Sequence, residues 1–480
     1  MLFASSAALL AASVYRAATY PFTGDESLSF AIFSWEPVWG VSANNHLLNT
    51  WLMRVCSSLF GNSELSLRLP NLLAHALYLV SVLALLRRFE HAALLLAGFA
   101  FFNLNPFMLD FFMVARGYGL ALAFTAAALS LLARAYDAKR RGAGFGASLY
   151  LSAAAGSLAV LSNYAFLNFY LPLLLACVWF FVTDESLRRF GRGRLAAAAA
   201  GLLAACGLFL AFVVSDLLRL QRAGGLYAGG KEGFFSDTVR SLVRVSLYYV
   251  PYTYASEWAV SAFVVGLFAA MLLLGVAVCV RHGEVPLFVP LLLVLALAAA
   301  LPVAQHNLVG TLFPVDRGAL PYVPLYAAAL LAAAHVLWQL PRRRWARAAA
   351  LAAPLLLAAL LVWHFRLSFT PHSLLLWWFH KHDRDAIELV ERDRAVHFPG
   401  RTVRLANSWM MEPSLNFYRV TRGYEWLEPI TREPPDGAQA DYVYAFASDF
   451  KGYAEPAQTL LASYPDTKTV LLRVNRAPAP

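Results

Sequence analysis

Apolar runs long enough to cross a lipid bilayer recur along most of this 480-residue chain. A bilayer-spanning helix needs about 20 predominantly apolar residues. Only 14% of the residues are charged, against roughly a quarter in an average soluble domain, so lipid is the solvent that can accommodate this much apolar surface. The sequence predicts a mainly α polytopic membrane protein with about eleven transmembrane helices. The candidate spans are Leu2–Thr19, Leu67–Leu86, Ala92–Leu109, Phe112–Leu132, Gly146–Asn163, Leu167–Val182, Leu195–Val214, Ala259–Val280, Val285–Leu301, Ala319–Trp338 and Ala348–Phe365.

Basic residues are distributed unevenly among the short loops between these spans. Lys and Arg clusters follow every second span, at Arg87–Arg88, Arg134 with Lys139–Arg141, Arg188–Arg194, Arg281 and Arg342–Arg347. Because cytoplasmic loops carry the Lys/Arg excess, we expect a cytoplasmic N-terminus. The Ala- and Arg-rich composition is typical of a GC-rich bacterium, which predicts an inner-membrane protein with a periplasmic C-terminal tail. Small residues near Ala17–Ala18 leave open the alternative that the first span is a cleaved signal peptide.

The net charge of +10 alone would allow a nucleic-acid partner, but its location argues against one. Of 39 Lys and Arg and 29 Asp and Glu, 13 and 14 respectively lie between Ser368 and Pro480, so this tail is nearly neutral. We expect a membrane domain over residues 1–367 and a small extracytoplasmic α/β domain over 368–480. The tail's expected helices are Asp385–Val396, Glu412–Tyr418 and Ala457–Ser463; its expected strands are Thr402–Ala406, Tyr442–Ala445 and Thr469–Val474, with a turn at Pro434–Gly437.

Two of the exported loops, 21–66 and 215–258, contain stretches with helical apolar spacing. In Asn44–Phe60 the apolar residues recur on one helix face, and within Phe234–Tyr249 two arginines lie four residues apart. Such helices can lie in the membrane plane, where arginines meet lipid phosphates. Helices of a solvated loop are the equal alternative.

Ionisable residues are nearly absent from the span interiors and gather at the predicted outer ends of the helices. His75 is the main interior exception, and we expect it to be neutral and hydrogen-bonded. A secondary transporter usually carries its polar site near the bilayer midplane, and a channel needs a polar pore lining. Polar residues at the outer interface instead favour a reaction between a lipid-borne substrate and an exported acceptor. Anchoring of helices at lipid headgroups is the simpler explanation for Arg68 alone. The outer residues are Asp25, Glu26, Arg68, Asp110, Arg116, Asp216, Asp316 and Arg317.

The exported loops also carry recognisable motifs. Thr23-Gly-Asp25-Glu26 follows the first span, Asn44-Asn-His46-Leu-Leu-Asn-Thr50 comes next, and Leu59-Phe-Gly61-Asn-Ser-Glu64-Leu-Ser-Leu-Arg68-Leu-Pro70 enters the second span. Asn105-Pro106 through Ala115-Arg116-Gly117-Tyr118, and Asp316-Arg317-Gly-Ala-Leu-Pro-Tyr322-Val-Pro324, complete the set. This set resembles the polyprenyl-phosphate-sugar glycosyltransferases of the GT-C superfamily, in the branch of protein O-mannosyltransferases and lipid A aminoarabinose transferases. Asn44–Leu47 and Gly117 depart from that pattern, because relatives commonly have prolines there.

The resemblance implies transfer of a hexosyl or pentosyl group from a polyprenyl-phosphate donor to a hydroxyl of an exported protein, lipid or glycan. Asp25 is then the candidate base, and its position against lipid is expected to raise its pKa. Glu26 would orient the site or substitute for Asp25 as the base. Asp110 would assist by binding the acceptor or the sugar. The candidate donor-phosphate ligands are His46, Arg116 and Arg317, then Lys231, Arg240 and Arg244. The resemblance implies no required cofactor. Some GT-C enzymes use a divalent metal, which stays the alternative, but the sequence has no evident metal cage. A lipid-linked-sugar flippase or transporter, and a non-catalytic scaffold, are the alternatives. Aromatic residues over Trp409–Tyr418 and Tyr424–Trp426 could stack on sugars, or pack a small core.

Overall fold

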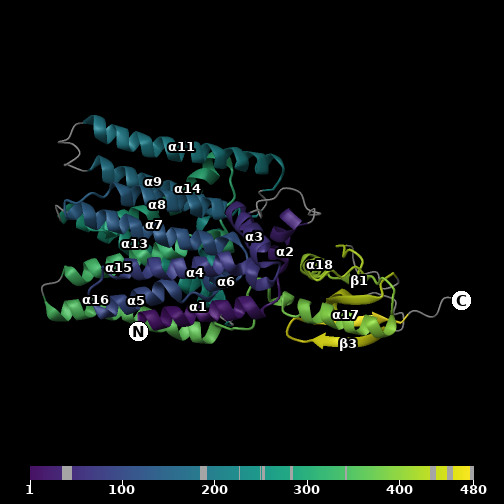
Figure 1. Cartoon of the computed structure of the whole chain (residues 1–480). Coiled ribbons are helices and arrows are strands. Elements are labelled where there is room, and N and C mark those ends of the chain that lie inside the picture. Colours follow the sequence, from purple (N-terminus) through teal and green to yellow (C-terminus); the bar gives the residue numbers. More distant parts are fainter. Residues whose placement is uncertain are drawn as a thin grey trace.

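The computed structural model describes residues 1–34, 46–183, 192–225, 228–248, 250, 254–281, 285–340, 343–432, 439–450 and 458–475. Long helices lie side by side in one bundle, and the C-terminal residues form a small α/β unit at one end of it (Figure 1). The bundle helices are α1 (Leu2–Thr19), α4 (Glu64–Leu86), α5 (Ala92–Asn103), α6 (Pro106–Met113), α7 (Gly117–Arg140), α8 (Gly146–Ser162), α9 (Leu167–Val182), α11 (Arg192–Arg222), α13 (Tyr254–Arg281), α14 (Phe288–Val309), α15 (Tyr322–Gln339) and α16 (Arg344–Ser368).

The chain is a multi-pass membrane protein, and the predicted fold class is confirmed. Eight helices among the described residues are long and apolar enough to cross a membrane, and α5 with α6 makes a ninth if this bent pair is one span. The remaining two of the predicted spans are also helical, as the shorter α8 and the 31-residue α11. Large apolar side chains face outward, such as Leu273 on α13 and Leu356 on α16, and lipid is their natural surrounding.

The predicted span Ala92–Leu109 is broken in the structure. Helix α5 ends at Asn103 and α6 begins at Pro106, with a bend of 61° between them. The Asn105 side chain accepts a hydrogen bond from Met108 N at 3.1 Å, and Pro106 occupies the first helical position. This Asn-Pro start is a strong helix N-terminus, so the chain begins a new helix instead of continuing the old one.

His75, inside α4, differs from the prediction. Its ring is fully buried and stacks on Phe112, with the ring centroids 4.5 Å apart. Neither ring nitrogen has a hydrogen-bond partner in the part of the chain that the structure describes, so the expected hydrogen bond is wrong. Packing against an aromatic ring, and not a polar network, holds this side chain.

Short elements cover the end of the bundle that faces the C-terminal unit. They are α2 (Gly24–Ser34), α3 (Leu47–Phe60), η1 (Tyr164–Phe166), the π-helical turn η2 (Phe234–Val239), α12 (Arg240–Leu247) and η3 (Asp316–Ala319). Helix α3 points Trp51 and Leu59 outward and buries Asn49, whose side chain donates to the Ala115 carbonyl at 2.9 Å. Helix α3 thus has an apolar exposed face and a polar buried face, which fits a helix at the membrane interface.

The C-terminal unit is a four-stranded sheet with helices. Its elements are η4 (Trp378–His380), α17 (Asp383–His397), β1 (Leu405–Asn407), α18 (Glu412–Thr421), β2 (Tyr442–Phe446), η5 (Ala447–Phe450), β3 (Gln458–Tyr464) and β4 (Thr469–Val474). The strand order is β1-β2-β4-β3, with β1 and β2 parallel and the other pairs antiparallel. The predicted small α/β unit is therefore present, while its boundary at residue 368 stays a prediction.

Most predicted elements of this unit are confirmed, and one is wrong. The expected helix Ala457–Ser463 is strand β3, which pairs with β4 through Leu460↔Leu472 and contains a bulge next to Leu460. Its Leu-Leu-Ala pattern is compatible with a helix, but pairing along β4 overrides that local preference. The expected turn Pro434–Gly437 lies outside the described residues.

Candidate active site

Asp25 lies at the start of α2, just beyond the end of α1, and forms an ion pair with Arg317. Arg317 Nη1 is 2.5 Å from Asp25 Oδ2, and the two side chains are 29% and 19% exposed. Arg317 comes from η3, which is 292 residues away in sequence. The structure thus brings together two of the predicted site residues and leaves both partly open to their surroundings.

Arg116 lies beside this pair and is fully buried. It precedes α7, and its Nη1 donates to the Asp25 carbonyl at 3.0 Å and to Ser29 Oγ at 2.8 Å. Ser29 is one helical turn after Asp25, so α2 supplies both acceptors. Two guanidinium groups therefore flank one carboxylate, which is a suitable arrangement for a phosphate group.

These cations control the protonation of Asp25. Burial raises the pKa of Asp25, but the positive charges of Arg317 and Arg116 outweigh burial and bring this pKa well below its usual range. The predicted raised pKa is therefore wrong for this state of the site, because the distance between the arginines and Asp25 is not visible in the sequence. Asp25 is a carboxylate here at any ordinary pH.

Glu26, the next residue, points in another direction and is fully buried with Arg68. Its two carboxylate oxygens each lie 2.7 Å from an Arg68 nitrogen, and they also accept from Ala115 N at 2.6 Å and Thr23 N at 2.9 Å. Arg68 in turn donates to the carbonyls of Ala17, Tyr20 and Pro21. Arg68 is therefore an internal ion-pair partner, and anchoring at lipid headgroups does not describe it.

This Glu26–Arg68 network holds the segments that carry Asp25 and Arg116. It joins the end of α1, the beginning of α2, the first turn of α4 and the residue before Arg116. Because Ala17 belongs to this network, α1 is an integral part of the site's support. The geometry supports a positioning role for Glu26, since its hydrogen-bonding capacity is taken up by protein groups.

His46 lies close to Asp25, Arg116 and Arg317, whose charges all act on it. The ring is 4% exposed and packs edge-on against Tyr118 with centroids 5.1 Å apart. Burial first, then Arg116 and Arg317, lower the pKa of His46 well below its usual value, so the ring is neutral. It has a hydrogen bond with the Ser162 backbone, while Nε2 has no partner among the described residues. His46 thus offers a neutral acceptor nitrogen.

Gly117 is required by the same close packing. A Cβ at this position would lie 1.8 Å from the Ser162 carbonyl oxygen and 2.8 Å from His46 Cβ. The proline that is common at this position in the resembling family would therefore not fit. This departure from the family pattern belongs to the local packing around His46.

Asp110 is buried in a different cluster. It accepts from Arg16 Nη2, Tyr248 Oη and Leu375 N at 2.7, 2.7 and 3.2 Å. Arg16 also donates to the Ser373 carbonyl. These contacts tie α1, α6 and the residue after α12 to the segment that leads into the C-terminal unit, so the geometry supports a structural role for Asp110.

The second-rank basic residues lie between α11 and α13, and Arg240 and Arg244 have other partners than Asp25. Arg244 Nη2 is 3.1 Å from Asp316 Oδ1, next to Arg317 in sequence, and is 62% exposed. Arg240 pairs with Glu257 at 3.0 Å and contacts the Trp258 ring. Lys231 is exposed, one residue after the Gly230 bridge to Phe313.

The C-terminal unit contacts the backbone next to Asp25, which the sequence did not indicate. His380 Nε2 accepts from Gly24 N at 3.0 Å, while His380 Nδ1 is 2.6 Å from Asp383 Oδ2. The Ser414 hydroxyl donates to the Phe22 carbonyl at 2.6 Å, and the Phe22 and Phe417 rings stack. The spacing His-x-x-Asp is too common to reveal the contact of His380 with Gly24 from sequence.

Among the tail aromatics, Phe417, Tyr418 and Tyr424 are buried in a core, and Trp409 is exposed.

No group of three or more His, Cys, Asp or Glu side chains suited to a metal ion is found among the described residues. The side chains around Asp25 are instead cationic or neutral, which suits an anionic ligand.

Comparisons with known proteins agree with this architecture. A family model described as dolichyl-phosphate-mannose-protein mannosyltransferase matches residues 45–214, which include His46, Arg68, Asp110 and Arg116 but not Asp25. No curated protein sequence gives a significant match.

Solved structures match over nearly the whole chain. ArnT from Cupriavidus metallidurans bound to undecaprenyl phosphate has a TM-score of 0.51 at 14% identity, over 97% of this chain and 96% of that chain. Its apo state gives a TM-score of 0.50 with the same identity and coverage. The oligosaccharyltransferase AglB from Archaeoglobus fulgidus is more distant, with a TM-score of 0.43 at 11% identity, over 92% of this chain and 69% of that chain. These comparisons confirm the resemblance drawn from the motifs, and the chain shares the fold of ArnT.

Proposed function

We propose that this protein transfers a glycosyl group from a polyprenyl-phosphate-linked donor to an acceptor hydroxyl at the membrane face that carries Asp25. The observation that carries this proposal is the Asp25 carboxylate between Arg317 and Arg116 at the helix ends. A polyprenyl chain keeps its sugar phosphate at the membrane interface, which is the depth of these side chains. ArnT, whose fold this chain shares, was solved with undecaprenyl phosphate.

The donor phosphate and Asp25 compete for the same arginines in this proposal. Without donor, Asp25 is held as the partner of Arg317 and its low pKa makes it a weak base. When the donor binds, its phosphodiester pairs with Arg317 and Arg116. The negative charge of the phosphate then offsets the positive charge that the two arginines exert on Asp25. Burial then raises the Asp25 pKa toward the range of a useful general base. Donor binding therefore activates the carboxylate.

The chemical step is a single displacement. The acceptor hydroxyl gives its proton to Asp25, and its oxygen attacks the anomeric carbon as the bond to the phosphate oxygen breaks. The products are the glycosylated acceptor, with inverted anomeric configuration, and polyprenyl phosphate. The phosphate gains negative charge as it leaves, and two guanidinium groups stabilise that gain where it develops. The neutral Nε2 of His46 accepts a hydrogen bond from a sugar or acceptor hydroxyl.

The remaining parts have supporting roles. Glu26 with Arg68 fixes the backbone around Asp25 and Arg116, and Asp110 with Arg16 fixes the entry to the C-terminal unit. Arg244, Arg240 and Lys231 attract the anionic donor to the loop. The positive-inside rule supports a cytoplasmic N-terminus, an extracytoplasmic site and a periplasmic C-terminal domain in a bacterial inner membrane. The acceptor is then an exported protein, lipid or glycan.

The direct test uses purified full-length protein, a panel of polyprenyl-phosphate sugars and the variant Asp25→Asn. We expect lipid-dependent transfer by the wild type and a loss of about 10²- to 10⁴-fold in the variant, which is the usual contribution of a general base. Its melting temperature should stay near that of the wild type, because Asp25 is partly exposed. Transfer that survives in Asp25→Asn would exclude Asp25 as the base, and transbilayer movement of the lipid-linked sugar without transfer would favour the flippase.

A further inference from the structure

A second polar region lies at the opposite ends of the same two helices. Helix α4 begins in the Arg68 network and ends just before Arg87, while α7 begins after Arg116 and carries Arg134 and Asp137 toward its end. Both helices therefore run in the same direction between the two regions. Their 23 and 24 residues correspond to about 35 Å, which is comparable to the thickness of a bilayer's hydrocarbon core.

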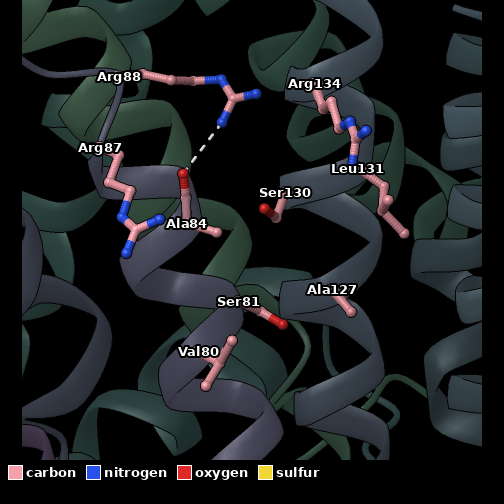
Figure 2. A pocket seen from close by; sticks show the side chains of 9 residues that line it. All are labelled: Val80, Ser81, Ala84, Arg87, Arg88, Ala127, Ser130, Leu131 and Arg134. Carbon is pink, nitrogen blue, oxygen red and sulfur yellow. Dashed lines mark hydrogen bonds between the residues drawn. The ribbon is translucent and has the colours of Figure 1, made fainter.

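A cavity of about 410 Å³ opens between α4 and α7 at this end. Along the helix axis the arginines lie at one end, Ser130 with Leu131 and Ala84 in the middle, and Ser81, Ala127 and Val80 at the other end (Figure 2). Arg88 reaches from α4 across the gap, and the Ser81 and Ser130 side chains extend into the space between the helices (Figure 2). The lining residues are Val80, Ser81, Ala84, Arg87, Arg88, Ala127, Ser130, Leu131 and Arg134.

Three arginines line this cavity, and in the described part of the chain one carboxylate, Asp137, pairs with one of them. Arg88 pairs with Asp137 at 2.8 Å and donates to the Ala84 carbonyl at 3.2 Å. Burial lowers the pKa of Arg88, Asp137 opposes this, and the charges of Arg141 and Arg134 lower it further. Both helix C-termini offset part of this charge through their dipoles. Positive-inside loops need arginines, but they do not require a cavity beneath them.

We propose that this cavity binds the headgroup of an acidic phospholipid in the membrane leaflet opposite the Asp25 site. The phosphate lies among Arg87, Arg88 and Arg134, with the serine hydroxyls as hydrogen-bond donors below it. The acyl chain continues along Ala127 and Val80, and Val80 is largely exposed on the outer surface of the bundle. The arginines at one end of the cavity and Val80 at the other follow the order of a phospholipid from headgroup to tail. Basic pockets between transmembrane helices are known to favour such headgroups.

The test measures lipid bound to the full-length protein by native mass spectrometry after exchange into micelles with phosphatidylglycerol or phosphatidylcholine. The test variant is Arg87→Gln/Arg134→Gln, which leaves the Arg88–Asp137 pair in place. The matched control is Arg343→Gln/Arg344→Gln, two exposed arginines that begin α16 outside the cavity. The predicted topology places them on the same side of the membrane.

We expect the wild type and the control to retain phosphatidylglycerol in preference to phosphatidylcholine, and the test variant to bind it about thirtyfold more weakly. Ser130→Phe, which fills the cavity without changing charge, should displace the lipid as well. Equal loss in the test and control variants would overturn the proposal, because the attraction would then be to the charged membrane side and not to the cavity. Binding of inorganic phosphate without phosphatidylglycerol would overturn it too.

Discussion

Asp25 and Glu26 are neighbours in sequence, yet the fold gives them opposite environments. Glu26 and Arg68 are both 0% exposed, whereas Asp25 and Arg317 are 19% and 29% exposed. Glu26 is surrounded by backbone donors, and Arg68 by backbone carbonyls. Asp25 faces two arginines that a phosphate can also use. One acidic pair thus contributes one group that organises the site and one that remains available for chemistry.

The difference follows from helix geometry and from what each pair costs. Successive residues of α2 point about 100° apart, so only one of the two carboxylates can face the interior. A fully buried ion pair is tolerated when its remaining hydrogen bonds are satisfied, and it is costly to break. A partly exposed pair contributes little to stability and exchanges partners easily. The burial of each pair therefore predicts whether its loss affects folding or transfer.

The largest expected effect on folding comes from Glu26→Ala. This change leaves the Arg68 guanidinium buried without its carboxylate, which costs about 3–5 kcal/mol. We expect a much lower melting temperature in detergent, measured by intrinsic tryptophan fluorescence. Asp25→Ala is the matched control, because it deletes the same charge one residue away and should change stability by less than about 1 kcal/mol. Equal melting temperatures for the two variants would show that burial does not separate the pairs.

The sequence predicts the depth of these residues better than their pairing. Hydropathy and loop charge locate Asp25, Arg116 and Arg317 at helix ends, and the structure brings all three together. Which carboxylate turns inward depends on the angle at which α2 leaves α1, and this angle is set by tertiary contacts from Arg68. The contact of His380 with Gly24 is likewise invisible, since the two lie 356 residues apart.

The fold likewise contains elements that the sequence predicts and elements that depend on tertiary contacts. Apolar runs identify the helices, because lipid selects for length and composition. Asn105-Pro106 is a helix-start signal in the sequence, but hydropathy alone does not show the break, because apolar residues continue on both sides of it. Strand β3 was not predictable from Gln458–Tyr464 alone, because its partner β4 decides its conformation.

A second, smaller effect concerns the pH dependence of transfer. Arg317 lowers the pKa of Asp25 in the free enzyme, so kcat/KM should hold to low pH in the wild type. The acid limb of kcat, which reports the donor-bound enzyme, should lie at higher pH because the phosphate then shares Arg317. Arg317→Gln removes this cation, which should shift the acid limb of kcat/KM upward and reduce kcat by about 10²-fold. Identical limbs in the wild type and the variant would contradict the competition between phosphate and carboxylate.

The same pKa sets a smaller dependence of stability on pH. The lowered pKa of Asp25 gives stability that is present above the unfolded value of about 3.9 and is lost as the pH falls through the folded value. The difference in stability between the wild type and Asp25→Asn should therefore not change with pH above about pH 5, and it should shrink only at lower pH. A wild type that loses stability relative to this variant between neutral pH and pH 5 would show that Asp25 is not held as a carboxylate.

The smallest effect is expected at the pair Arg244–Asp316, which is 62% and 33% exposed and lies next to Arg317. Solvent and salt screen such a pair, so Arg244→Gln should leave the melting temperature unchanged and raise the KM for the donor by less than about fivefold. The rise should shrink at high salt, because the remaining role of Arg244 is long-range attraction of an anionic lipid. Arg240→Gln is the matched control. Its partner Glu257 is more buried than Asp316, so loss of the Arg240–Glu257 pair should affect stability more than KM. A large fall in kcat for Arg244→Gln would instead bring Arg244 into contact with the departing phosphate and extend the exchangeable set beyond Arg317 and Arg116.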